Sequence, residues 1–112
     1  MQAITLGLIG VPTPGTPVRV SSDETLRAML MLVRTVPGFG GKTYLGVAGM
    51  NKNSAEKTGV IRILSEPPAF GPQDGEVLPP GTGGAGNVIQ VSDYWVDADV
   101  AGEGVTVTCF VA

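Results

Sequence analysis

The chain has 112 residues with a net charge of −3, and charged residues make up only 15% of it. This length predicts one domain, and 17 glycines and nine prolines favour short strands joined by turns over a helical bundle. The seven basic residues are scattered and no zinc-finger or RNA-recognition motif occurs, which argues against nucleic-acid binding. With one cysteine and no histidine, the chain has no internal disulfide and no histidine base to activate a thiol.

The first element that we expect is a strand over residues 2–9, inside an apolar run that ends at residue 11. The run lacks the basic start and the cleavage site of a signal peptide, and it is too short to span a membrane. We therefore expect a protein that is made and used without secretion and has no membrane partner. The proline-rich segment 12–17 should end this strand, and a second strand is predicted over residues 18–21.

Residues 22–34 allow two interpretations. Ser21 and Glu24 have the spacing of a capping box that opens a helix, and the Leu, Met and Ala residues that follow are good helix formers. Residues 28–33, however, are six consecutive apolar positions with no polar stripe, which is typical of a strand buried on both faces. Because the surrounding pattern is that of strands, we predict a strand here.

The remainder of the chain repeats the same pattern of short apolar segments and Gly/Pro turns. Residues 65–86 form one long irregular stretch, in which Val77 and Leu78 are a possible short pairing. About eight strands in all predict an all-β, single-domain antiparallel β-sandwich over residues 1–112, either a jelly roll or Ig-like. The further strands are expected at residues 42–48, 59–64, 87–91, 94–99 and 105–111.

Alternation in the C-terminal strands assigns side chains to faces. Tyr94 and Trp95 are neighbours on one strand and must point to opposite faces. One of them should lie in the core and the other is a candidate interface anchor, although the sequence does not say which. Cys109 lies in an apolar strand and is predicted to be a small buried hydrophobic residue.

Four carboxylates form the only dense acidic group, and they allow three interpretations. Asp97 and Asp99 share one strand face and could bind a hard cation together with Asp93 or Glu103, or act as an acid–base pair. A solvated strand face that discourages edge pairing is the interpretation that we favour. Gly81–Gly86 lacks the Lys and Ser/Thr of a phosphate loop. We therefore predict no catalytic residue, no metal and no cofactor.

In the types and order of several short motifs, the chain resembles the small structural proteins of tailed bacteriophages, among them capsid decoration or cement proteins. The motifs are Pro-Val-Arg-Val-Ser (17–21), Gly-Lys-x-Tyr-Leu-Gly (41–46), Leu-Pro-Pro-Gly (78–81) and Val-Asp-Ala-Asp-Val-x-Gly-Glu-Gly-Val (96–105). This resemblance implies a β-sandwich or jelly roll that forms a homotrimer and clamps the major capsid protein on the capsid surface of the virion. It brings no catalytic residues.

The function expected on this basis is a non-enzymatic decoration protein that stabilises the head shell. Alternatives are a phage tail, neck or baseplate component, and a small carbohydrate-binding β-sandwich module, for which six aromatic residues are few. Long loops and exposed aromatics are the expected contact regions. The interface candidates are Pro12, Pro14, Phe70, Val77, Leu78, Tyr94 and Trp95.

Overall fold

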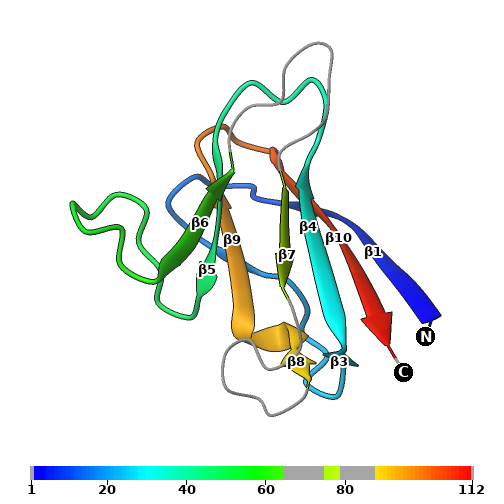
Figure 1. The fold of residues 1–112 in the computed structure, drawn as a ribbon. Helices are drawn as coiled ribbons and strands as arrows, with labels where there is room; N and C mark the ends of the chain where they lie inside the picture. The colour runs from blue at the N-terminus through cyan, green and yellow to red at the C-terminus, as the bar shows by residue number, and fades with distance from the viewer. Residues whose placement is uncertain (1, 65–74, 79–87, 112) are drawn as a thin grey trace.

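The structure is a computed structural model that describes residues 2–64, 75–78 and 88–111, with only the backbone of 75–78. Two four-stranded antiparallel sheets face each other (Figure 1). The first, sheet A, has the strand order β1 (Gln2–Gly10), β10 (Gly104–Val111), β4 (Leu30–Thr35) and β7 (Gly75–Leu78). The second, sheet B, has the order β2 (Val18–Arg19), β9 (Tyr94–Ala98), β5 (Thr43–Val47) and β6 (Val60–Leu64).

A short ribbon and one 3-10 turn complete the described elements. The ribbon pairs β3 (Arg27–Ala28) with β8 (Ile89–Gln90), and the turn η2 (Val91–Asp93) joins β8 to β9. No α-helix occurs in residues 2–64, 75–78 or 88–111. The predicted all-β antiparallel sandwich is therefore confirmed.

The strand order identifies the kind of sandwich. β3 continues into β4 and β8 continues into β9, so the ten described strands form eight longer runs. Counted as runs, the sheets have the orders 1-8-3-6 and 2-7-4-5, in which the first and last runs are neighbours. This is the double-sheet arrangement of a jelly roll, whereas an Ig-like sandwich groups its strands differently.

The apolar part of the ambiguous segment 22–34 forms the strands β3 and β4, as predicted. Its polar start is a turn, in which the Ser21 hydroxyl accepts a hydrogen bond from Asp23 N–H (3.1 Å) and the Asp23 carboxylate accepts one from Thr25 N–H (2.9 Å). The expected burial of the strand on both faces is wrong. Along β4, buried side chains alternate with half-buried or exposed ones, among them the exposed Arg34, because nothing described covers the outer side of sheet A there.

The core lies between the sheets and is built by alternate residues of their central strands. From β10 the inward side chains are Val105, Val107 and Cys109, and from β9 they are Tyr94, Val96 and Ala98. Cys109 is fully buried, as predicted, and burial raises the pKa of its thiol. The other members of the core cluster are Val11, Val20, Ala28, Met31, Val33, Leu45, Leu64, Ile89 and Val91.

The strands β1 and β10 pair along their whole length, from Gln2 opposite Val111 to Gly10 opposite Gly104, so the two chain ends lie side by side (Figure 1). The register shifts between Thr5 and Gly7, where Gly7 has a φ of 75°. At the other end of the pair, a Cβ on Gly104 would collide with the carbonyl oxygen of Ile9. Gly104 therefore allows the two backbones to approach closely.

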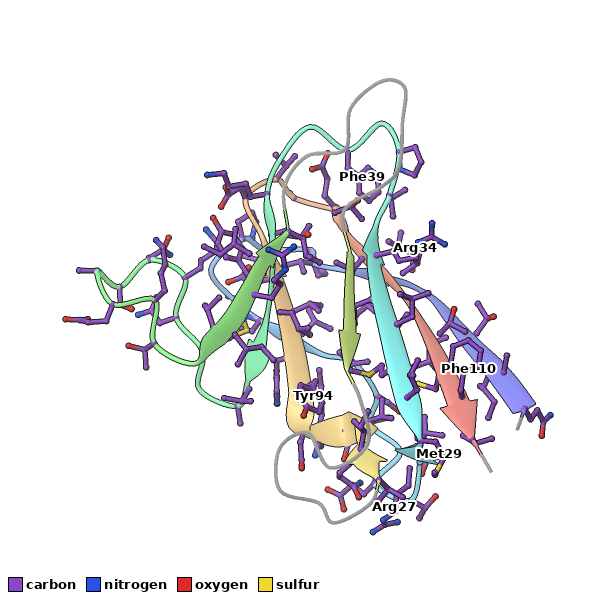
Figure 2. All side chains as sticks on the ribbon, viewed as in Figure 1. Arg27, Met29, Arg34, Phe39, Tyr94 and Phe110 are labelled. Atoms are coloured by element: carbon purple, nitrogen blue, oxygen red, sulfur yellow. The ribbon has the colours of Figure 1, made fainter. Side chains whose placement is uncertain are left out.

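The outer side of sheet A carries no charge over most of its area. Phe110 lies on this side over β10, and Arg34 projects from β4 at its border (Figure 2). We call the following set of outward side chains the uncharged face: Ala3, Thr5, Leu8, Leu30, Leu32, Thr106, Thr108 and Phe110.

Candidate functional site

A hollow of about 490 Å³ opens at one end of sheet B. It is formed where β9 begins, beside the turn η2 and the end of β5. Its lining consists of Arg19, Val47, Ala48, Ser92, Asp93, Tyr94 and Trp95. The volume falls within the range of about 300–1,000 Å³ that is usual for small-ligand sites.

The pleat of β9 decides the roles of the two adjacent aromatic residues. Tyr94 points toward the core and is only 2% exposed, whereas Trp95 lies on the outer side of sheet B and is half-buried. Figure 2 shows Tyr94 at the end of β9 next to η2. This settles the question that the sequence left open, because Tyr94 is the core residue and Trp95 is the aromatic on the outer surface.

Arg19 is held in a fixed position beside Trp95. The two residues are cross-strand partners on β2 and β9, and the guanidinium carbon lies 6.0 Å from the centre of the indole ring. The Arg19 Nε–H donates a hydrogen bond to the carbonyl oxygen of Ser92 (2.6 Å), and Nη2 lies 3.5 Å from a carboxylate oxygen of Glu24. Several weak contacts of this kind orient the planar guanidinium before any ligand arrives.

The rest of the hollow combines one carboxylate with apolar groups. Asp93 is exposed, and its side chain forms no hydrogen bond or ion pair with any described residue. Val47 is 38% exposed. The phenol oxygen of Tyr94 is buried and has no hydrogen-bond partner among the described residues. Burial, followed by the nearby charge of Asp93, raises the pKa of this phenol.

Asp97 corrects the prediction of a solvated acidic face. Its side chain is fully buried, and one carboxylate oxygen accepts hydrogen bonds from the N–H groups of Gly15 (3.0 Å) and Ala98 (2.7 Å). The other oxygen has no partner among the described residues. Residues 11–17 cover this part of sheet B, which the alternation of β9 alone does not reveal. Asp97 therefore fastens a loop to the sheet.

Asp99, on the same face, belongs to a separate cluster with Tyr44 and Lys52. Lys52 Nζ lies 3.2 Å from one carboxylate oxygen and 5.7 Å from the centre of the Tyr44 ring. The Tyr44 hydroxyl donates to the same carboxylate, at 3.0 Å and 3.1 Å from its two oxygens. Burial first, and then the hydrogen bond to Asp99, raise the pKa of Tyr44 to about 12.

The four acidic residues thus have different local partners. Glu103 accepts hydrogen bonds from the N–H groups of Gly40 and Gly41 (3.1 Å and 3.0 Å), whereas Asp93 is part of the hollow. Within residues 2–64, 75–78 and 88–111, no group of three or more His, Cys, Asp or Glu side chains is placed to hold a metal ion.

Of the other predicted interface residues, Pro12 and Pro14 do not line the hollow. Pro12 and Pro14 are exposed in the loop before β2. Val77 and Leu78 belong to β7 and pair with Leu32 and Met31 of β4, which confirms the suggested short strand. Phe70 lies outside the described residues, as does most of the 65–86 stretch.

The sequence analysis therefore found two lining residues, Tyr94 and Trp95, and missed the rest of the hollow. Arg19 and Asp93 appeared in the sequence only as a scattered basic residue and one of four acids. The pairing of β2 with β9 brings Arg19 to Trp95, and this long-range contact has no local signal.

No helix long and apolar enough to span a membrane occurs among the described residues. No family model, no curated protein and no solved structure matches this chain.

Proposed function

We propose that this protein is a non-enzymatic structural component of a phage particle, a decoration protein that binds the major capsid protein on the outside of the head and stabilises the shell. The observation that carries this proposal is the uncharged face of sheet A. The motif resemblance supplies the phage setting. The face supplies a surface suited to permanent contact with other protein.

Neither β1 nor β10 contains a charged residue, although they lie side by side at the surface of the molecule. Leu8, on this face, is 50% exposed. Charged side chains are depleted at the centres of protein interfaces and are common on the rest of a protein surface. A broad uncharged area of Thr, Leu and Phe side chains is therefore suited to being covered by a partner.

The free edge of sheet A supports the same proposal. Of the four edge strands of sheets A and B, β2, β6 and β7 each contain a charged residue, whereas the nine-residue β1 has none. Soluble proteins usually protect a sheet edge with charges, prolines or a bulge, since unpaired backbone groups otherwise pair with another chain. Only the bulge is present in β1. We infer that copies of this chain associate, and a closed trimer is the form that the resemblance implies.

The jelly-roll arrangement is compatible with this proposal by analogy only. Viral capsid proteins and lectins both use it, so the arrangement does not choose between a structural and a sugar-binding role. A tail, neck or baseplate component would use the same surfaces. Mass spectrometry of purified heads and tails separates these locations, because a decoration protein is recovered with the heads.

The proposal is tested by co-sedimentation with capsids that lack the protein. We expect the wild-type chain to pellet with the shells, and a Leu8→Lys/Thr108→Lys variant to stay in the supernatant, since lysines would have to be desolvated at the contact. Ile61→Lys is the matched control, because Ile61 is 49% exposed on β6 of the other sheet. Equal binding by both variants would contradict the proposal that the uncharged face is the contact.

Self-association is measured separately by light scattering. A trimer has three times the 11.4 kDa mass of the chain, about 34 kDa. We expect this mass for the wild type and the mass of a single chain for the Leu8→Lys/Thr108→Lys variant. A wild-type monomer both free in solution and on shells would contradict the trimer.

A further inference from the structure

The hollow on sheet B presents three kinds of surface within one small volume. Trp95 and Val47 provide apolar surface, Arg19 provides hydrogen-bond donors, and Asp93 provides acceptors. The hollow lies on the opposite sheet from the uncharged face, so a ligand bound there would not compete with assembly through sheet A. Its chemistry can therefore be considered separately from the proposed structural function.

The donors of Arg19 are only partly used. A guanidinium carries five N–H groups in a fixed plane. In Arg19, the Nε–H is bonded to the Ser92 carbonyl and Nη2 lies near Glu24, while Nη1 has no hydrogen-bond partner among the described residues. The same contacts hold the guanidinium against Trp95. A ligand would meet donors that are already oriented, which reduces the entropy lost on binding.

The charges around the hollow restrict the class of ligand. An anion would be attracted by Arg19 but repelled by Asp93 and Glu24, and a cation would be attracted by these two acids but repelled by Arg19, so neither charge is favoured by all three groups. A purely apolar ligand would remove water from Arg19 and Asp93 without replacing their hydrogen bonds. The remaining class is neutral, carries several groups that both donate and accept hydrogen bonds, and has an apolar side.

A pyranose ring has these properties. Each hydroxyl donates one hydrogen bond and accepts others, so neighbouring hydroxyls can satisfy an arginine and an aspartate together. The C–H groups of the ring form an apolar patch that packs on aromatic and aliphatic side chains, here Trp95 and Val47. We propose that this hollow binds one or two neutral sugar units of a glycan, with Trp95 as the apolar platform and Arg19 and Asp93 as the polar contacts.

The chain provides its own reporter for this proposal, because Trp95 is its only tryptophan. The intact protein is titrated with neutral monosaccharides and disaccharides while tryptophan fluorescence is recorded. We expect a saturable change with a dissociation constant of about 1 mM. The absence of a saturable change with every neutral sugar up to about 50 mM would overturn the proposal.

Variants connect the signal to the hollow. Asp93→Asn and Arg19→Gln should each weaken binding about tenfold, since each removes a charge-assisted hydrogen bond. Glu56→Gln is the matched control, because Glu56 is an exposed carboxylate in the 50–58 loop, and it should bind like the wild type. Far-ultraviolet circular dichroism checks that the variants are folded. Equal affinities for all three variants would overturn the assignment of these residues.

Two competing ligand classes are tested in the same titration. A zwitterionic amino acid could contact Arg19 and Asp93 with opposite charges, and a sialic acid adds a carboxylate to a sugar. We expect both to bind more weakly than the best neutral sugar. The amino acid has no ring to pack on Trp95, and the carboxylate of either ligand is repelled by Asp93 and Glu24. Tighter binding of glycine, or of the sialic acid, would overturn the proposed neutral class. None of these results depends on capsid binding, so this proposal and the structural function fail separately.

Discussion

The outer faces of the two sheets are built in opposite ways. On sheet B, Asp97 is buried under residues 11–17 and Lys52 is only 9% exposed beside Tyr44 and Asp99. On sheet A, the uncharged face has Thr and apolar side chains. One sheet uses its outer face to attach its own loops, and the outer face of the other carries no charge over most of its area, with Arg34 at its border.

This difference shows that the few charged groups of the chain are used mainly to hold its own loops in place. The acid of β9 and an acid in the turn between β9 and β10 hold segments distant in sequence, since Asp97 bonds Gly15, and Glu103 bonds Gly40 and Gly41. Hydrogen bonds to charged groups contribute more than neutral ones. We therefore expect substitutions on sheet B's outer face to change stability and substitutions on sheet A's outer face to change association.

The largest effect is expected for Asp97→Ala. The variant removes the acceptor of two N–H groups and leaves a small cavity, so the free energy of unfolding should fall by about 3 kcal/mol. Asp99→Ala is the control on the same strand face. Its carboxylate is 40% exposed, so water can reach the groups that it leaves, and the loss should be smaller, about 1 kcal/mol. Urea denaturation measures both, and equal losses would mean that loop attachment does not depend on Asp97.

A second prediction concerns the close approach of β1 and β10. Gly104→Ala places a methyl group against the Ile9 carbonyl and should cost about 2 kcal/mol, because the two backbones must separate. Gly40→Ala is the matched control, since nothing lies within 4 Å of its added Cβ and its φ is not positive. Thermal denaturation of both variants checks this prediction. An unchanged melting temperature for Gly104→Ala would show that β1 can move away from β10 at little cost in free energy.

The third prediction is that the protein loses stability at high pH because of the raised pKa of the Tyr44 phenol. Its pKa is about 10 in an unfolded chain and is raised to about 12 in the fold. Between these values the folded chain keeps a proton that the unfolded chain has lost, so stability is complete below pH 10 and falls by up to about 2 kcal/mol toward pH 12.

The Tyr44→Phe variant isolates this contribution, because Cys109 and Tyr94 also have raised pKa values. Urea denaturation at pH 8, 10 and 11.5 gives the difference in the free energy of unfolding between wild type and variant. This difference should shrink as the pH rises. A difference independent of pH would mean that the Tyr44 phenol titrates normally in the fold.

The smallest stability effect is expected on the uncharged face. Leu8→Thr should change the free energy of unfolding of the isolated chain by less than about 0.5 kcal/mol, since half of the side chain is already in water. Urea denaturation at low protein concentration is the measurement. A loss comparable to that of Asp97→Ala would remove the contrast between the two outer faces.

Local patterns predicted most of the fold. Alternation along residues 94–98 and 105–109 gave the strands and the inward side chains, and turn residues marked their ends. The strands within the segment 22–34 were correctly predicted, because the surrounding pattern of strands outweighed helix propensity. The choice between jelly roll and Ig-like sandwich depends on which strands become neighbours, and no local pattern reports that.

The candidate site was less predictable for the same reason. The alternation of β9 placed Asp97 on the face away from the core, which is correct, and solvent was therefore expected there. The 11–17 loop, more than 80 residues away in sequence from its contact, replaces that solvent. Likewise Trp95 was found by residue type, whereas Arg19 reaches it only through the β2–β9 pairing.

The pairing of β1 with β10 also has a consequence for the order of folding. Gln2 pairs with Val111, so β1 leaves the ribosome well before β10 and has to wait for it. Contacts of such high sequence separation slow folding, because a long loop must close before they form. During that interval an uncharged strand of nine residues has no partner within its own chain, and unpaired strands of this kind aggregate. The same lack of charge that suits β1 to a shared surface makes rapid completion of the chain, or help from a chaperone, valuable during synthesis.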